Sequence, residues 1–235
     1  MTYRLDHGHD GVALLALDRP PVNALDLAGV LALEAAFKAL QGAPPTALVL
    51  TGAGRAFCAG ADTRAFAAAT HAERAQLILA ITRMIGALYA LPCPAIAGVN
   101  GHALGGGFVL VLACDVRLAV PAPDLRMGLT EARAGVPFPA GPLEIIKTEL
   151  GPNLLRRLTL TSAVMSPGEL HEAGVVDALV DADQLIPEAR RIALDMASQP
   201  GFGLVKAQLR AATIARLQSL AASGEDPLIA ALGAG

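Results

Sequence analysis

The first half of the chain alternates short apolar runs with longer segments in which apolar residues recur every three or four positions. Each run is short enough for a buried β-strand and is bounded by turn residues, so it is predicted to be a strand. A run of this kind begins at Ala95. The others are residues 12–17, 47–51, 116–120 and 125–129.

The longer segments predict amphipathic helices. Asp26 is the expected N-cap of the first helix, which Gln41-Gly-Ala-Pro-Pro45 ends. The second helix runs from about Thr70 to Leu91, before Pro92-Cys-Pro94. The apolar face of the first comprises Leu27, Val30, Leu31, Leu33 and Phe37, and that of the second comprises Leu77, Ile81, Ile85 and Leu88.

The second half of the chain is mostly helical in pattern, with a proline or glycine near an end of each segment. Strands that alternate with helices, followed by helices alone, predict the α/β class with a helical appendage. We place the core at residues 1–180 and the C-terminal helical region at 181–235. The predicted helices are residues 142–150, 152–161, 167–173, 183–198 and 204–222.

Two glycine-rich and alanine-rich loops follow predicted strands. Gly105, Gly106 and Gly107 lie between a strand and a helix, where glycine allows positive φ and the first helical N–H groups lack intrahelical partners. In the second loop, small side chains from Ala59 to Ala61 leave backbone N–H groups accessible, and Asp62 can cap the next segment. Such loops can hold an anion, although glycines there can also serve close packing alone.

The stretch from Met84 to Cys114 contains no Asp, Glu, Lys or Arg, and by length alone it could span a membrane. Two prolines, an Asn-Gly turn and the five glycines at positions 98, 101, 105, 106 and 107 argue against one continuous helix. The chain is 54% hydrophobic, with a mean hydropathy of +0.51. We therefore expect a deeply buried core element and further apolar surface buried between subunits.

The charge distribution disfavours nucleic acid as a partner, because the net charge is −3 and lysine and arginine are spread thinly. The first residues lack the pattern of a signal peptide, and Cys58, Cys93 and Cys114 lie among small or apolar residues without a C-x-x-C pair. We expect a cytoplasmic protein with buried thiols, without disulfides or a structural metal and without membrane attachment. His7 and His9 are assigned to a solvated turn.

Four blocks of sequence, in this order and at this spacing, resemble the enoyl-CoA hydratase/isomerase family, also called the crotonase family. A fifth segment, Ala173-Gly-Val-Val-Asp177, resembles the family's A-G-L-V-D segment. The four blocks are Arg19-Pro-Pro-Val-Asn-Ala-Leu25, Thr51-Gly-Ala-Gly-Arg-Ala-Phe-Cys-Ala-Gly-Ala-Asp62, Ala97-Gly-Val-Asn-Gly-His-Ala-Leu-Gly-Gly-Gly107 and Ala113-Cys-Asp-Val-Arg117.

The resemblance implies a core of repeated ββα units wound into a superhelix and a C-terminal helical region used in trimer formation. It implies a homotrimer or a dimer of trimers, and an acyl-CoA thioester as substrate, with coenzyme A as part of that substrate and no permanently bound cofactor. The backbone N–H groups of Ala61 and Gly106 correspond to the two that hold the thioester oxygen. Each such donor typically lowers the barrier by about 2.7 to 4 kcal/mol. Further substrate-binding positions implied by the resemblance are Ala24, Leu25, Ala59, Gly60, Asp62 and Gly105.

The chain departs from the family's hydratases, which use two glutamates. The position of the first is Val109, whereas the second is retained as Glu131. One carboxylate suffices to move a proton from C2 to C4 of a 3-enoyl thioester, so the pattern resembles that of Δ3,Δ2-enoyl-CoA isomerases. Such a carboxylate works best when an apolar pocket raises its pKa toward neutrality.

Two alternatives to the isomerase remain open. A hydratase could use Glu144, on a predicted helix, as a substitute second acid. A family member could also bind acyl-CoA without turnover.

Among other polar residues, Asp115 is expected to be a buried cap and His102 to be packed structurally. Arg55 and Lys206 are candidates for contact with the CoA phosphates, but isolated cations are usually solvated.

Overall fold

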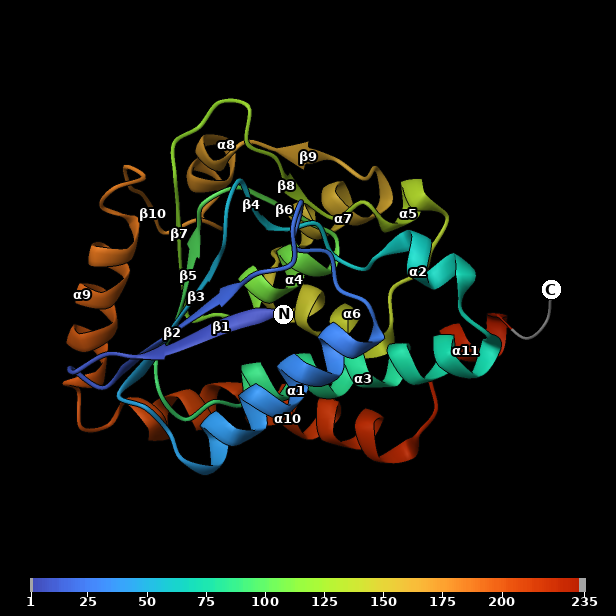
Figure 1. Cartoon of the computed structure of the whole chain (residues 1–235), viewed down its shortest axis with the longest axis horizontal. Helices are drawn as coiled ribbons and strands as arrows, with labels where there is room; N and C mark the ends of the chain where they lie inside the picture. Colours follow the sequence, from blue (N-terminus) through green and yellow to red (C-terminus); the bar gives the residue numbers. More distant parts are fainter. Residues whose placement is uncertain (1, 233–235) are drawn as a thin grey trace.

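The structure is a computed structural model that describes residues 2–232, and its strands form two sheets (Figure 1). In the larger sheet the strand order is β1-β2-β3-β5-β7-β10, and only the β1–β2 pair is antiparallel. Its strands are β1 (Tyr3–His7), β2 (Val12–Leu17), β3 (Ala47–Gly52), β5 (Ala95–Val99), β7 (Val116–Ala119) and β10 (Ala178–Leu179).

The smaller sheet has the order β4-β6-β8-β9, with β4, β6 and β8 parallel and β9 antiparallel to β8. Three pairs of successive strands therefore contribute one strand to each sheet, and a helix follows each pair. The pairs are β3 with β4, β5 with β6, and β7 with β8. These are repeated ββα units, so the predicted fold class is confirmed. The strands are β4 (Ala56–Cys58), β6 (His102–Leu104), β8 (Met127–Gly128) and β9 (Val164–Met165).

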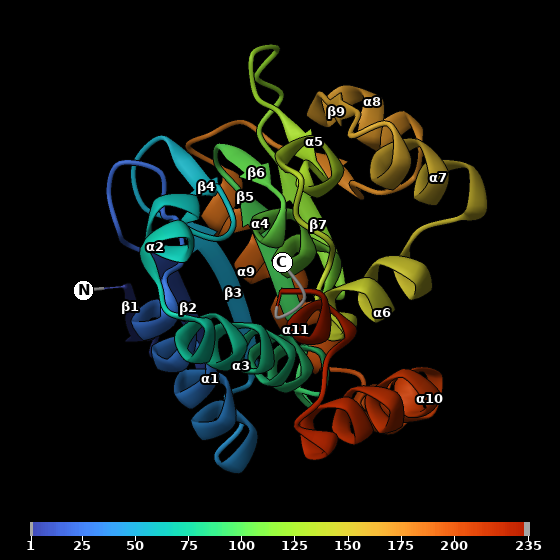
Figure 2. The same ribbon diagram turned by 90° about the vertical axis from the view of Figure 1, so that its right-hand side faces the viewer.

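The helices cover the sheets on several sides. Helix α9 (Leu185–Ala197) packs on one face of the larger sheet, and α4 (Gly106–Leu112) lies on the other side (Figure 1). Helices α1 (Leu27–Gly42) and α3 (His71–Tyr89) pack together, and α10 (Phe202–Ser223) lies against α3 and α6 (Figure 2). The remaining helices are α2 (Thr63–Ala68), α5 (Glu131–Ala134), α6 (Ala140–Glu149), α7 (Pro152–Leu160), α8 (Pro167–Glu172) and α11 (Pro227–Leu232).

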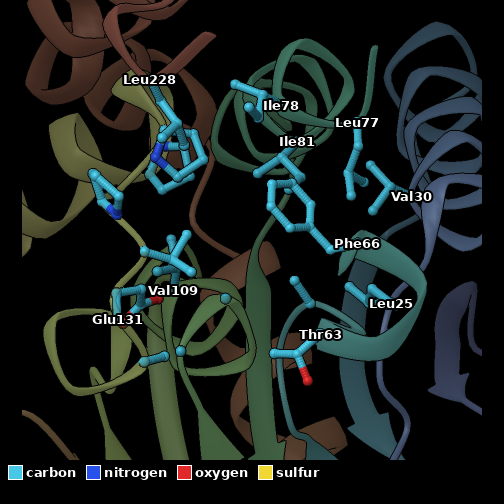
Figure 3. Close-up of a pocket in the computed structure, with 18 of the residues that line it drawn as sticks. Leu25, Val30, Thr63, Phe66, Leu77, Ile78, Ile81, Val109, Glu131 and Leu228 are labelled. Atoms are coloured by element: carbon cyan, nitrogen blue, oxygen red, sulfur yellow. The ribbon is translucent and has the colours of Figure 1, made fainter. Parts of the chain in front are cut away.

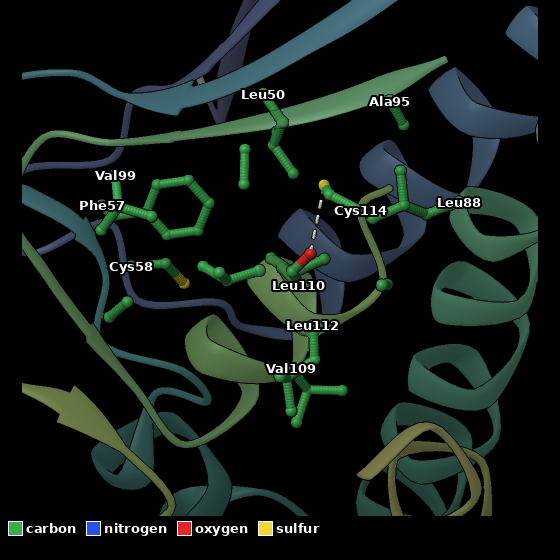
Figure 4. Packing of buried hydrophobic residues seen from close by; sticks show 14 of the residues in the cluster. Leu50, Phe57, Cys58, Leu88, Ala95, Val99, Val109, Leu110, Leu112 and Cys114 are labelled. Carbon is green, nitrogen blue, oxygen red and sulfur yellow. Dashed lines mark hydrogen bonds between the residues drawn. The ribbon is translucent and has the colours of Figure 1, made fainter. Parts of the chain in front are cut away.

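The uncharged stretch before Asp115 forms the centre of the core, as predicted. Residues 108–114 of α4 and its end are at most 1% exposed. Their side chains meet Leu50 and Val99 of the larger sheet, Phe57 of the smaller sheet and Leu88 of α3 (Figure 4). Within residues 2–232, no helix is both long and apolar enough to cross a bilayer.

Helix starts follow the predicted capping chemistry. Asp26 accepts a hydrogen bond from the Gly29 N–H at 2.8 Å, and Asp62 accepts from the N–H groups of Arg64 and Ala65. The second predicted helix begins at His71, where Thr70 and Glu73 form a capping box. The helices of the second half also appear near the predicted bounds.

Some elements differ from the sequence predictions. Strand β1 was not predicted because it lies at an edge and only alternate residues, Tyr3 and Leu5, pack on the core. His7 belongs to this strand rather than to a turn, although it is exposed as expected. The run 125–129 contains only the two-residue strand β8. Helix α9 lies beyond the predicted domain boundary at residue 180 yet packs on the core sheet.

A buried ionic cluster joins α10 to the core. Asp115 accepts from Lys206 Nζ at 2.6 Å, from Arg210 at 3.0 Å and from the Ala95 N–H at 2.7 Å. The Lys206 and Arg210 side chains are each 6% exposed. The expectation that Lys206 is solvated or free for CoA phosphates is therefore wrong, because Asp115 and the Cys93 carbonyl occupy its ammonium group. Asp115 has the structural role that was expected.

We expect Asp115→Ala to destabilise the protein by about 3–5 kcal/mol, because it leaves two buried cations without their carboxylate. Urea unfolding at neutral pH measures the difference. Glu188→Ala is the control, since it removes the exposed Arg191–Glu188 pair and is expected to cost at most about 1 kcal/mol. Equal losses for the two variants would contradict the assigned role of the cluster.

Candidate functional site

A cavity of about 340 Å³ opens between α3, α4, α5 and the loop that follows β4 (Figure 3). One end is formed by Ala61, Gly106 and Glu131. The opposite wall is aliphatic and is supplied mainly by one face of α3, with Phe66 of α2 and Leu228 of α11 beside it. The α3 residues on this wall are Leu77, Ile78, Ile81, Met84 and Ile85.

The two glycine-rich and alanine-rich loops meet at the polar end of the cavity. A Cβ atom built on Gly60 would lie 2.9 Å from the Gly106 nitrogen, so only glycine fits there. Gly60 also has φ +82°, which favours glycine. A Cβ atom on Gly106 would lie 4.0 Å from the Ala61 nitrogen. The backbone amides of Ala61 and Gly106 are therefore neighbours, although they come from different ββα units.

The backbone pairing leaves these two amides unused. Leu25 forms a parallel bridge to Ala61, in which the Leu25 N–H donates to the Gly60 carbonyl at 2.8 Å and the Asp62 N–H donates to the Leu25 carbonyl at 2.8 Å. In such a bridge the N–H of the middle residue points to the other side. Gly106 is the first residue of α4, so its N–H has no intrahelical partner. Within residues 2–232, neither amide donates to a protein acceptor.

Glu131, the first residue of α5, faces this end of the cavity. A Cβ atom on Gly105 would lie 3.1 Å from Oε1 of Glu131, so the carboxyl group rests against the glycine triplet. Oε2 is buried and has no hydrogen-bond partner among the described residues. Burial raises the pKa of Glu131 to about 7, while the N–H groups of Glu131 and Thr130 act in the opposite direction. The group is thus poised to exchange a proton near neutral pH.

Six of the nine predicted site residues line this one cavity, and three do not. Ala24 uses its carbonyl to accept from Arg19, and Gly60 lies behind the cavity wall, where it permits the close approach of the loops. Asp62 caps α2 and pairs with Arg19 at 3.0 Å. The N–H of Ala65 and the Arg19 guanidinium hold the pKa of Asp62 below its usual range. The six that line the cavity are Leu25, Ala59, Ala61, Gly105, Gly106 and Glu131.

Other candidates lie elsewhere. Val109 is part of the cavity wall beside Glu131 (Figure 3). Glu144 is half-buried on α6 and is not among the residues that line the cavity. His102 is exposed, and its Nδ1 accepts from the Arg126 N–H at 3.0 Å, so the expectation that it is packed is wrong. Arg55 lies with His102 in a separate surface hollow.

Sequence reasoning did not identify the residues of the aliphatic wall as part of a site. Leu77, Ile81 and Ile85 belong to the predicted apolar face of this helix, but helical spacing does not distinguish a cavity wall from the core. Phe66 and Leu228 belong to short helices without a clear periodic pattern. Asp226 places α11 here, because its carboxylate accepts from the Ala140 N–H at 2.7 Å and the Leu228 N–H at 2.9 Å.

A comparison with known sequences decides the family. The sequence model described as enoyl-CoA hydratase/isomerase matches residues 7–226. The chain belongs to this family. The family that the sequence blocks predicted is thereby confirmed. Residues of the glycine-rich and alanine-rich loops in two of those blocks line the cavity.

Curated relatives of this hydratase/isomerase family member include two kinds of protein. It is 33% identical over 186 residues to a crotonyl-CoA hydratase from Syntrophomonas wolfei, covering 77% of this chain and 70% of the relative. It is also 33% identical over 202 residues to a glyoxysomal fatty acid beta-oxidation multifunctional protein from Brassica napus, covering 84% of this chain. The chain spans only 28% of that multifunctional protein.

Solved structures agree with the fold of this family member. Human mitochondrial Δ3-Δ2-enoyl-CoA isomerase superposes with a TM-score of 0.86 at 23% identity, covering 96% of this chain and 92% of the human chain. Pseudomonas aeruginosa DspI superposes with a TM-score of 0.82 at 27% identity, covering 90% and 87% of the two chains.

We expect Glu131→Gln to gain roughly 3 kcal/mol of stability relative to the parent protein between pH 4 and pH 8. The raised pKa of Glu131, about 7 against 4.5 in the unfolded chain, means that its contribution to stability is complete below pH 4.5. That contribution is lost as the pH rises through 7. Urea unfolding of both proteins at pH 4 and pH 8 measures the change in their difference.

The exposed Glu172 on α8 provides the matched control. Glu172→Gln is expected to show no such gain between pH 4 and pH 8. A stability difference between parent and Glu131→Gln that stays constant with pH would contradict the burial of an unpaired carboxyl group.

Proposed function

We propose that this chain moves the double bond of an enoyl-CoA thioester from position 3 to position 2, with Glu131 as the acid–base group. One observation carries the proposal: of the described residues that line the cavity, Glu131 alone has a carboxyl group, and it lies beside the two unused amides. Val109 stands at the position where the resemblance places the other glutamate of hydratases.

The reaction needs one base and one electrophilic site. The Glu131 carboxylate removes a proton from C2 of the 3-enoyl thioester, and the electron pair of that C–H bond delocalises onto the thioester oxygen. The N–H groups of Ala61 and Gly106 stabilise the negative charge that develops on this oxygen. The protonated Glu131 then returns the proton to C4, and the double bond is re-formed between C2 and C3. No atom is gained or lost.

The aliphatic wall supports a hydrocarbon acyl chain as the rest of the substrate. Leu77, Ile81 and Met84 of α3 have no hydrogen-bonding group to pair with a hydroxylated chain. Burial of each methylene contributes about 0.8 kcal/mol to binding. The binding of an unreactive acyl chain can therefore hold C2 and C4 against Glu131.

The three free cysteines, all buried, support placing this reaction in the reducing cytoplasm.

The hydratase alternative lacks a second carboxyl group among the described residues that line the cavity. Hydration requires activation of water and delivery of a proton, work that two carboxylates share most easily. Glu144 is not among the described residues that line the cavity, which weighs against it as the substitute acid. Because a relative is a crotonyl-CoA hydratase, hydration is the second candidate function. Binding of acyl-CoA without turnover is the third.

Incubation with a 3-enoyl-CoA is expected to produce the 2-enoyl-CoA, measured by the absorbance of the conjugated thioester. Glu131→Gln is expected to lower kcat by about 10² to 10⁴-fold, because it removes the one carboxyl group found among the described lining residues, while acyl-CoA binding persists. Glu144→Gln is the control and should leave kcat unchanged. Absence of 2-enoyl-CoA, or rapid hydration that Glu144→Gln abolishes, would refute the isomerase assignment.

We further infer that the chain associates with itself through α10, as a homotrimer or a dimer of trimers. Leu204, Val205 and Leu209 are 74%, 61% and 82% exposed on this helix. Large apolar side chains gathered on one exposed helix mark an interaction surface. The support is the exposed helix and the resemblance together.

Light scattering is expected to give a mass of at least three chains for the parent protein. The double variant Val205→Asp with Leu209→Asp should lower that mass, because a buried interface does not tolerate unpaired carboxylates. Arg191→Asp on α9 is the control for an added acidic residue at an exposed site. A parent mass equal to one chain would exclude the association.

A further inference from the structure

Asn23 is a buried polar residue that the proposed reaction does not use. It is 2% exposed and has φ +53°, a left-handed conformation that is unusual for residues other than glycine. It lies in the connection between β2 and α1, in the segment that we call the anchor segment, residues 22–25. Strain of this kind persists only where surrounding contacts impose it.

Both polar atoms of the Asn23 side chain contact backbone groups. Its Nδ2 lies 3.0 Å from the Ala53 carbonyl oxygen, 2.8 Å from that of Ala56 and 3.2 Å from that of Phe57. Its Oδ1 accepts from the Arg19 N–H at 2.9 Å. Carbonyl oxygens only accept hydrogen bonds, so the amide nitrogen must face the three of them. The anchor segment is thereby fixed to β4 and to Ala53 in the turn that precedes it.

The anchor segment in turn holds the loop that carries the Ala61 amide, residues 59–62, here called the donor loop. The Ala59 N–H donates to the Val22 carbonyl at 3.0 Å, on one side of Asn23. On the other side, Leu25 forms the parallel bridge to Ala61 that leaves the Ala61 N–H unpaired. The position of this N–H is therefore set by the anchor segment.

We propose that Asn23 is a positioning residue, which aims the Ala61 N–H at the thioester oxygen by fixing the anchor segment against which the donor loop is paired. The inference rests on the proposed function for the identity of the bound oxygen. It makes the Asn23 side chain, rather than its left-handed backbone alone, necessary for the hydrogen bond from the Ala61 N–H to the substrate carbonyl.

Three substitutions separate the side chain from the backbone. Asn23→Gly adopts positive φ without strain but has no side-chain amide. Asn23→Ala has no side-chain amide either, and its Cβ atom disfavours positive φ. Asn23→Asp retains the shape but turns a carboxylate toward three carbonyl oxygens. Asn100→Ala is the matched control, because Asn100 also bonds backbone groups, the Gly52 N–H and the Gly54 carbonyl, without touching the donor loop.

The decisive readout is the infrared carbonyl stretch of a bound saturated acyl-CoA labelled with ¹³C at the thioester carbonyl. Hydrogen bonds to this oxygen weaken the C=O bond and lower its frequency. We expect the lowered frequency in the parent protein, in Glu131→Gln and in Asn100→Ala. The part of this shift that the Ala61 N–H causes should be lost in Asn23→Gly and Asn23→Asp, with kcat lowered about 10- to 100-fold and a smaller change in KM.

The outcomes separate the two proposals. A full carbonyl shift and full kcat in Asn23→Gly would overturn the positioning role, whatever the loss of thermal stability, and would leave Asn23 a structural residue. If Asn23→Asp does not fold, Asn23→Gly and Asn23→Ala still decide the question. Because the labelled ligand undergoes no reaction, its spectrum tests Asn23 even if the parent protein shows no isomerase activity.

Discussion

The close approach of the end of β4 to the start of α4 is the constraint on which the site depends. A Cβ atom on Gly107 would lie 2.1 Å from the Cys58 carbonyl oxygen, and one on Gly60 would lie 2.9 Å from the Gly106 nitrogen. Backbone therefore touches backbone where two ββα units meet. This contact brings together two amides that are far apart in the sequence, and it excludes side chains from the space between them.

The glycines alone do not determine this arrangement. The donor loop is paired to the anchor segment, and α4 is packed among residues of both sheets and α3 (Figure 4). The ionic cluster at Asp115 joins the end of α4 to α10, so the helix that begins at Gly106 is fixed at both of its ends. Rigid supports of this kind let a site hold two hydrogen-bond donors at one oxygen without reorganisation.

The parts of the fold that could be predicted from the sequence are those with a strong local signal. Strands such as β2 and β3 are continuous apolar runs because a parallel sheet buries both of their faces. Strand β1 alternates and lies at an edge, and β8, β9 and β10 have two residues each, too few for a periodic pattern. The family blocks supplied the arrangement that periodicity could not.

The candidate site shows the same division. Glu131 and the two loops could be located from their motifs, because the motifs are contiguous in the chain. The pairing of Lys206 with Asp115 and the position of Leu228 in the cavity wall depend on contacts between distant segments. The contacts of Asn23 could not be foreseen either, since its three acceptors are main-chain carbonyls that have no signature in the sequence.

The location of one carboxyl group on one wall of the cavity has a stereochemical consequence for the proposed reaction. With Val109 as an aliphatic neighbour of Glu131, hydrogen can leave C2 and arrive at C4 only from the side on which Glu131 lies. The migration is then suprafacial. Since Oε2 of Glu131 is buried, the hydrogen that arrives is expected to be largely the one that left, and a deuterium label at C2 then moves to C4 rather than into the solvent.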